Sequence, residues 1–96
     1  MAEVRLIARA QARQGSADEL KSVLRGMVKP TRAETGCKFY ELFESSLPGV
    51  LYFNELWESQ AHLDAHMASS HFKEIFGKAK PLLQAPLEAN YLKSVE

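Results

Sequence analysis

The stretch CKFYELFESSLPGVLYFNELW, residues 37–57, consists of two apolar segments joined by a turn sequence. The joining residues, 46–49, read SLPG, and a Pro-Gly pair suits a short turn because these residues adopt the backbone angles that tight turns require. We therefore expect strands at residues 37–45 and 50–57 that pair as an antiparallel hairpin.

Both of these strands carry large apolar side chains on both faces, since side chains alternate along a strand. In the second strand the alternation separates two apolar sets, Leu51, Phe53 and Trp57 on one face and Tyr52 and Leu56 on the other. In the first strand it separates Cys37, Phe39 and Phe43 from Tyr40 and Leu42. Strands that are apolar on both faces are usually buried on both faces.

The residues before the hairpin predict a strand and a helix. Alternating apolar side chains predict the strand at residues 3–12. Ser16 and Glu19 have the spacing of a capping box, in which the two residues exchange side-chain to backbone hydrogen bonds at a helix start. The helix that follows should kink or end a first segment at Pro30 and stop by Gly36.

The residues after the hairpin predict helices and a last strand. Ser59 is a candidate N-cap for a short helix, and Ser69 or Ser70 is a candidate N-cap for a second helix. We expect a last strand at residues 87–95. The order strand, helix, strand, strand, helices, strand is that of the α+β ferredoxin-like, split βαβ fold with an antiparallel sheet. Right-handed connections would place both helical regions on the same face of this sheet.

The second face of the sheet then needs another partner. Helices can cover only one face, and another copy of the same sheet is the simplest cover for the other. We therefore predict a homodimer in which two sheets face each other, a dimeric α+β barrel.

Bulk composition excludes several classes of protein. Twelve Lys and Arg residues balance twelve Asp and Glu residues, so the chain lacks the basic excess of a nucleic-acid-binding protein. We expect no membrane span and no signal peptide, and a single domain over residues 1–96. The lone Cys37 rules out an internal disulfide and favours a cytoplasmic location; its thiol is either a small buried apolar group or a nucleophile.

The histidines are the main candidates for chemistry. His62 and His66 are four residues apart on a predicted helix, a spacing that zinc sites use. The usual companions of such a site are missing: there is no HExxH motif, no cysteine pair, and no acidic residue clearly on the same inner face. We therefore expect no metal at this position.

The helical positions separate the three histidines. If Leu63 and Met67 form the buried stripe, His66 lies at its margin, where it is either a hydrogen-bonded core residue or a site residue, and His62 points toward solvent. His71 follows a serine cap and so lies in the first turn of its helix. The helix dipole disfavours an imidazolium ion there, and we expect the ring to stay largely neutral and able to accept a proton.

Glu55 is the unusual member of an otherwise apolar face. A carboxylate beside Trp57 needs a partner or a raised pKa. We expect Arg5 or Arg9 of the first strand, or a group of a second subunit, to pair with it in a structural role. Trp57 itself is expected to belong to the core.

These segments resemble those of a known family. The resemblance lies in the runs Thr31-Arg32-Ala33-Glu34-Thr35-Gly36-Cys37, Tyr40-Glu41-Leu42, Glu55-x-Trp57, Ala61-His62-Leu63-x-Ala65-His66 and Ser70-His71-Phe72. It is a resemblance to the antibiotic biosynthesis monooxygenase family and its small quinol monooxygenases. It implies a ferredoxin-like homodimer that oxidises a small aromatic quinol or phenol with O₂ and without a cofactor or metal.

The resemblance also implies a site between sheet and helices. We expect His66 and His71 to be the catalytic residues, one of them acting as base or proton shuttle. The substrate-binding residues are expected to be Trp57, as a wall and indole N–H donor, with Tyr40, Phe53, Met67 and Phe72. Haem degradation is not expected, because the first strand, VRLIARAQAR, lacks the asparagine that the haem-degrading branch uses. The alternatives are a dimer that binds a small molecule or serves in stress response without chemistry, and an isomerase or ring-opening enzyme of a small carbonyl compound.

Overall fold

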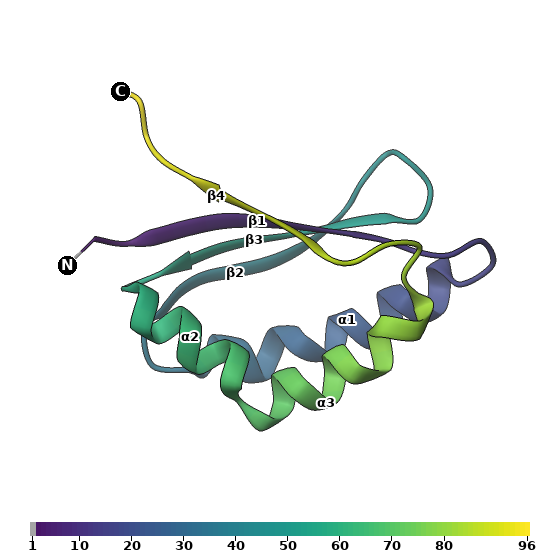
Figure 1. Cartoon of the computed structure of the whole chain (residues 1–96), viewed down its shortest axis with the longest axis horizontal. Coiled ribbons are helices and arrows are strands. Elements are labelled where there is room, and N and C mark those ends of the chain that lie inside the picture. The colour runs from purple at the N-terminus through teal and green to yellow at the C-terminus, as the bar shows by residue number, and fades with distance from the viewer. Residues whose placement is uncertain (1) are drawn as a thin grey trace.

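The computed structural model describes residues 2–96 and shows one antiparallel sheet with helices against one of its faces (Figure 1). The elements in chain order are β1 (Val4–Gln11), α1 (Ala17–Arg32), β2 (Cys37–Glu44), β3 (Val50–Trp57), α2 (Gln60–Ala68), α3 (Ser70–Ala79), the short 3₁₀ helix η1 (Lys80–Leu82) and β4 (Glu88–Leu92). The strand order is β2-β3-β1-β4, with β1 and β3 in the centre. The predicted ferredoxin-like fold is confirmed.

The inner face of the sheet is the face toward the helices, and the apolar side chains predicted from the alternation along the strands lie on it. Leu6, Ala8 and Ala10 of β1 are buried beside Phe53 and Trp57 of β3. The small alanines of β1 belong to one buried cluster with larger side chains of β3 and the helices, among them Trp57 and Leu24. This face carries the hydrophobic core.

The β2–β3 hairpin forms as predicted, with one irregularity in β2. Tyr40 lies opposite Glu55, but the register shifts between Cys37 and Phe39. Cys37 is therefore opposite Trp57 and packs on the core, whereas Phe39 is opposite Leu56 on the outer face. The prediction that these two residues share a face is wrong, because a bulge interrupts the two-residue alternation.

Helix α1 begins after Ser16 and stops before Gly36, as predicted, but its start lacks the predicted side-chain cap. Ser16 is the N-cap residue, but its side chain makes no capping hydrogen bond, so the predicted capping box is absent. The helix runs through Pro30 and ends at Arg32. Proline removes the hydrogen bond to the carbonyl four residues earlier, here that of Gly26, and this residue is exposed, so water can serve its carbonyl instead.

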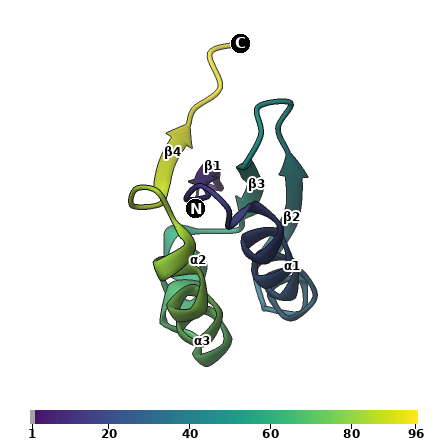
Figure 2. The same ribbon diagram turned by 90° about the vertical axis from the view of Figure 1, so that its right-hand side faces the viewer.

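Helices α2 and α3 both begin at serine caps. The Ser59 hydroxyl accepts a hydrogen bond from the His62 backbone N–H, and the Ser69 hydroxyl accepts one from Phe72. Figure 2, which looks along the helices, shows α1 on one side beneath the sheet and the α2–α3 pair on the other. None of the helices within residues 2–96 is long and apolar enough to cross a membrane.

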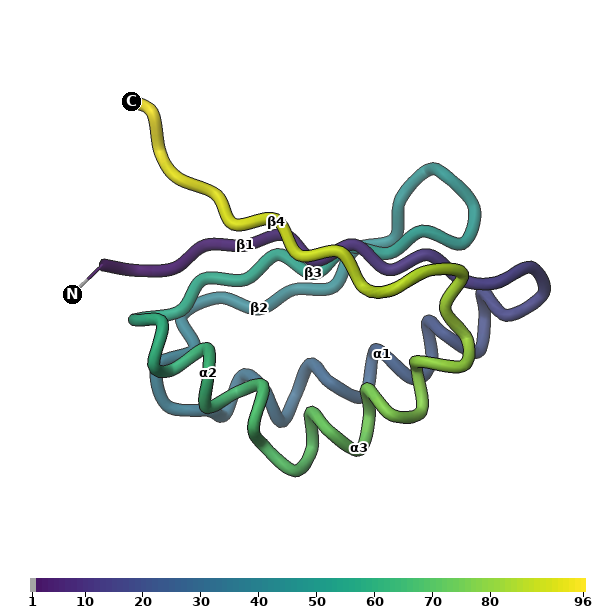
Figure 3. Tube along the Cα trace, in the orientation of Figure 1, coloured from purple at the N-terminus to yellow at the C-terminus, as the bar shows by residue number. Residues whose placement is uncertain are grey.

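The outer face of the sheet, the face away from the helices, retains exposed apolar side chains. Phe43 of β2 is 48% exposed and Leu92 of β4 is 47% exposed. Strand β4 is shorter than predicted and exposed throughout, and the tube in Figure 3 runs away from the sheet after it. This face fits the predicted dimer, which stays a prediction.

Candidate functional site

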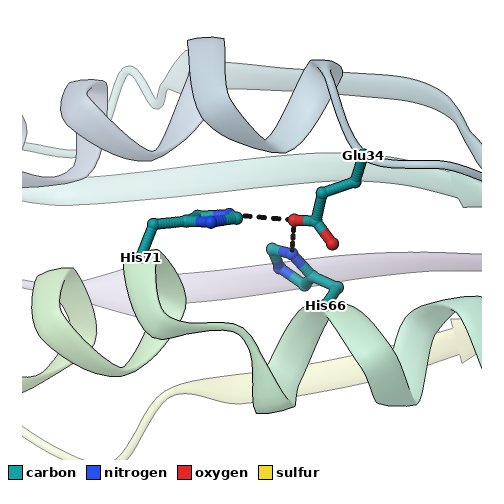
Figure 4. Close-up of side chains that lie close together, drawn as sticks. All are labelled: Glu34, His66 and His71. Atoms are coloured by element: carbon teal, nitrogen blue, oxygen red, sulfur yellow. Dashed lines mark hydrogen bonds and ion pairs between the residues drawn. The ribbon is translucent and has the colours of Figure 1, made fainter.

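Two histidines and a glutamate meet between α1 and the α2–α3 pair (Figure 4). The Nδ1 atom of His66 lies 2.7 Å from Oε2 of Glu34, and Nε2 of His71 lies 2.9 Å from the same oxygen. Since a carboxylate oxygen can only accept hydrogen bonds, both imidazoles donate to it when Glu34 is ionised. We name Glu34, His66 and His71 the carboxylate–histidine cluster.

The three residues lie near the ends of helices, and the turns at these ends bring them together. Glu34 follows the end of α1, and its backbone N–H donates to the carbonyl of Thr31 at 3.0 Å. His66 is in the last turn of α2, and His71 is in the first turn of α3, where it was predicted. Between them Ser69 ends one helix and caps the next, and its hydroxyl donates to the His66 carbonyl at 2.6 Å.

His66 is a core residue and not a marginal one. It is 2% exposed, whereas Met67 is 40% exposed, so the predicted buried stripe of Leu63 and Met67 is wrong. The buried positions of α2 are Leu63 and His66, three residues apart, because the helix turns a different side toward the sheet. Met67 lies on the exposed side of α2.

Aromatic rings enclose the imidazole of His66. Ring centroids of Trp57, Phe72 and Tyr40 lie 4.8, 5.0 and 5.6 Å from its own. Burial lowers the pKa of His66, while the hydrogen bond and charge of Glu34 act in the opposite direction. The net effect favours a neutral ring that donates to the carboxylate.

His71 and Glu34 are the members of the cluster that solvent reaches. Their side chains are 24% and 17% exposed. The hydroxyl of Thr31, a fully buried residue of α1, lies 3.4 Å from Nε2 of His71. Sequence reasoning missed Thr31 as a neighbour of the site, although the run Thr31–Cys37 was part of the family resemblance.

Glu34 is the site residue that sequence analysis did not assign. The expectation that no acidic residue joins the histidines on the inner side is wrong, because Glu34 is brought there by the loop after α1. A pattern search within one helix could not find it. Two signals were present: its place two residues before Gly36, in the turn that ends the α1 region, and its membership of the run Thr31–Cys37 that carried the family resemblance.

His62 lies outside the cluster and is half-buried, which corrects the prediction that it points to solvent. Its Nδ1 atom is 2.8 Å from the Ser59 hydroxyl, and its ring packs against Gly36. Gly36 has a φ of +84°, and a Cβ at this position would overlap the His62 ring. This glycine therefore permits both the turn after Glu34 and the close approach of α2.

Glu55 has a different partner from the one expected. The indole N–H of Trp57 donates to its Oε1 at 2.9 Å, while the guanidinium of Arg5 lies 3.5 Å from Asn54 and that of Arg9 lies 3.3 Å from Gln11. The arginines are on the outer face, since β1 directs them away from the helices. Burial raises the pKa of Glu55 to about 7. The Trp57 N–H is thus already engaged, and in this arrangement it does not serve as the expected substrate donor.

Of the other expected substrate-binding residues, three lie close to the carboxylate–histidine cluster and one does not. Tyr40 is buried, packs on Phe53 with a centroid distance of 5.0 Å, and burial raises the pKa of its phenol. It also borders a pocket of about 350 Å³, whose other lining residues are Arg32, Cys37, Lys38, Phe39 and Glu41. Phe53, Phe72 and Tyr40 are therefore grouped around the histidines or their neighbours, and Met67 is not.

The sequence of this chain is similar to those of known proteins. Residues 3–78 match the sequence model of the family described as antibiotic biosynthesis monooxygenase. Rv0793 of Mycobacterium tuberculosis is 36% identical over 89 residues, covering 93% of this chain and 88% of that protein. YcnE of Bacillus subtilis is 33% identical over 72 residues, covering 74% and 76%. The names of both relatives describe candidate monooxygenases.

Solved structures of two similar proteins have the same fold as this chain. The structure of Rv0793 superposes with a TM-score of 0.91 at 34% identity, covering 99% of this chain and 97% of that one. PA3566 from Pseudomonas aeruginosa gives a TM-score of 0.91 at 31% identity, covering 100% and 97%.

Proposed function

Because the chain belongs to the antibiotic biosynthesis monooxygenase family, we propose that it is a monooxygenase that oxidises a small aromatic quinol or phenol with O₂ and needs no cofactor. The observation that carries the proposal is the carboxylate–histidine cluster, set among buried aromatic rings. In the reaction a phenol and O₂ give a quinone and water: one oxygen atom enters the ring, and the substrate itself supplies the two electrons that reduce the other oxygen atom to water. The protein's part is to accept a proton from the substrate and to hold the resulting anion in a low-polarity site.

His71 is the better candidate for the base. Its hydrogen bond to Glu34 puts the proton on Nε2 and leaves Nδ1 with a free lone pair. When Nδ1 accepts a proton, the carboxylate at 2.9 Å stabilises the imidazolium ion, as a carboxylate does for other catalytic histidines. His71 is also partly exposed, so a substrate can approach it.

His66 has the supporting role in this proposal. It is buried and shares the Glu34 oxygen with His71, and so fixes the position of the carboxylate. Tyr40, Phe53, Trp57 and Phe72 form the apolar surroundings. We further propose that the protein works as a homodimer in the cytoplasm, on the grounds of its apolar outer face and its single cysteine.

The test is oxygen uptake by protein freed of metal, across a panel of hydroquinones, naphthoquinols and polyphenols. We expect uptake above the autoxidation blank for some of these compounds, with at least a tenfold loss in His71→Ala. The matched control is Lys73→Ala, an exposed residue in the same helix that lies outside the cluster. Uptake equal to the blank for every compound, or full activity in a folded His71→Ala protein, would refute the proposal.

A dimer that binds a small molecule without chemistry is the second candidate. One observation favours it: both histidines are held by hydrogen bonds to the same carboxylate, as they would be in a purely structural cluster. Binding of a quinone to the wild-type protein, seen as quenching of Trp57 fluorescence, together with uptake equal to the blank, would support this second function.

A further inference from the structure

We propose that Glu34, His66 and His71 form a binding site for one divalent transition-metal ion, with Zn²⁺ as the ion to test first. Each residue offers one ligand atom, and the three atoms lie within 4.8 Å of one another. Two imidazole nitrogens and one carboxylate oxygen form the ligand set of many zinc sites that keep an open coordination position. The same set also binds iron in oxygen-activating proteins.

The spacing of the ligand atoms requires only a small change. In a tetrahedral zinc site with bonds of about 2.1 Å, neighbouring ligand atoms are about 3.4 Å apart. The Glu34 oxygen now lies 2.7 and 2.9 Å from the two nitrogens, at hydrogen-bond distance. A bound ion would replace the two hydrogen bonds and move the Glu34 oxygen away from each nitrogen by roughly 0.5 to 0.7 Å, to about 3.4 Å. The two nitrogens, which lie within 4.8 Å of each other, would also have to approach that distance. The long, partly exposed Glu34 side chain can supply the first movement and the partly exposed His71 ring the second.

A metal ion can reach the cluster from the side of His71 and Glu34, whereas the His66 ring on the other side is held in place by its neighbours. His66 is held among aromatic rings and is 2% exposed, so its nitrogen is a fixed ligand. His71 and Glu34 are 24% and 17% exposed, so an ion can reach them from solvent and keep water as a further ligand. Thr31 lies beside Nε2 of His71 at 3.4 Å and can hydrogen-bond a metal-bound water.

Binding changes the tautomers of both rings and leaves their charge unaltered. His66 must present the lone pair of Nδ1 and His71 that of Nε2, so each ring moves its proton to its other nitrogen through solvent. The cluster with an ionised Glu34 and neutral rings carries one negative charge, which a divalent ion more than offsets. This balance favours a cation in a site that is partly removed from water.

A metal at this position would also affect the proposed oxidation. An ion bound to the cluster takes the carboxylate away from His71 and so removes the support for its imidazolium form. We therefore expect Zn²⁺ to inhibit uptake of oxygen, and this consequence alone rests on the proposed function. Binding of the ion is independent of it, and for this reason the test measures binding.

The experiment titrates Zn²⁺ into the untagged full-length protein, after treatment with a chelator, by isothermal calorimetry. We expect one ion per chain in the wild type, with affinity reduced at least tenfold in Glu34→Gln and in His71→Ala. His62→Gln is the matched control, because it removes the histidine that lies outside the cluster, and its affinity should equal that of the wild type. Zn²⁺ should also raise the Tm of the wild type, because it binds only the folded cluster.

Co²⁺ gives a second measurement that does not depend on heat. Its visible absorption should show nitrogen and oxygen ligands without a thiolate band, in the wild type and in His62→Gln. If Glu34→Gln does not fold, Glu34→Asp, which keeps the charge but shortens the side chain, takes its place and should also bind more weakly. Absence of binding at millimolar Zn²⁺, or equal affinity in the wild type and in both cluster variants, would overturn the proposal whatever the result of the oxygen-uptake test.

Discussion

Glu34 orients two histidines through a single oxygen atom. Its Oε2 receives Nδ1 of His66 and Nε2 of His71, from two different helices. A carboxylate that binds two imidazoles lowers the freedom of both rings and defines which nitrogen of each carries the proton. At the scale of single residues, the site therefore depends as much on Glu34 as on the histidines that the sequence made conspicuous.

Glu55 is the residue whose ionisation should be visible in the stability of the protein. Its folded pKa is about 7, against an ordinary value of 4.5. Between these two values the folded state binds more protons than the unfolded state, so the free energy of unfolding must fall as pH rises through this window. Above it, the buried carboxylate continues to destabilise the folded protein.

We expect Glu55→Gln to remove this pH dependence, because a glutamine carbonyl can still accept the Trp57 N–H. Urea unfolding at pH values from about 5 to about 8 should show the wild type losing on the order of 2–3 kcal/mol relative to the variant. Parallel stability curves for the two proteins would show that Glu55 titrates normally in the fold.

At the scale of elements, the junctions between helices and strands decide the site. The turn after α1 carries Glu34 inward, and the cap at Ser69 lets α2 stop and α3 start so that His66 and His71 both reach it. Gly36 is the tightest point of this arrangement, since its positive φ and the His62 ring leave no room for a side chain.

Gly36→Ala should therefore destabilise the fold. A Cβ at Gly36 would strain the backbone and displace His62, and we expect a loss of about 2–4 kcal/mol in the free energy of unfolding. Gly77→Ala is the matched control, because Gly77 lies inside α3 with nothing near its Cβ position, and alanine there should stabilise by about 0.5–1 kcal/mol. Urea unfolding of the two variants measures both effects; equal stability of the two would contradict the role given to Gly36.

At the scale of the whole molecule, the helices pack against the inner face of the sheet and leave its outer face uncovered (Figure 1). The outer face exposes Phe43 and Leu92 together with polar side chains of β1. A symmetric pair of such faces would bury the same residues on both subunits. The predicted homodimer would remove these side chains from water.

We expect the protein to elute as a homodimer in size-exclusion chromatography with light scattering. Phe43→Glu should shift the equilibrium toward monomer at least tenfold, because it would bury a charge between the sheets. Met67→Glu is the control, since Met67 is similarly exposed but lies on α2, away from the outer face. A monomeric wild type, or equal association of the two variants, would contradict a dimer through this face.

The sequence by itself determined the elements, their order and the inner face. The alternation in residues 50–57 and the serines at positions 59 and 69 are local signals, and local signals describe strands and helix starts well. The same local reasoning was wrong at Ser16, whose side chain makes no capping hydrogen bond, and between Cys37 and Phe39, where a bulge breaks the alternation.

Only the tertiary structure decided what surrounds the histidines. Glu34 and His66 are 32 residues apart in the chain, and no periodicity within one element relates two residues at that distance. Which side of α2 faces the sheet depends on how the whole helix packs, and this choice buried His66 and exposed Met67. The partner of Glu55 was also set by packing, because the strand pairing turns Arg5 and Arg9 outward and leaves Trp57 as the donor within reach.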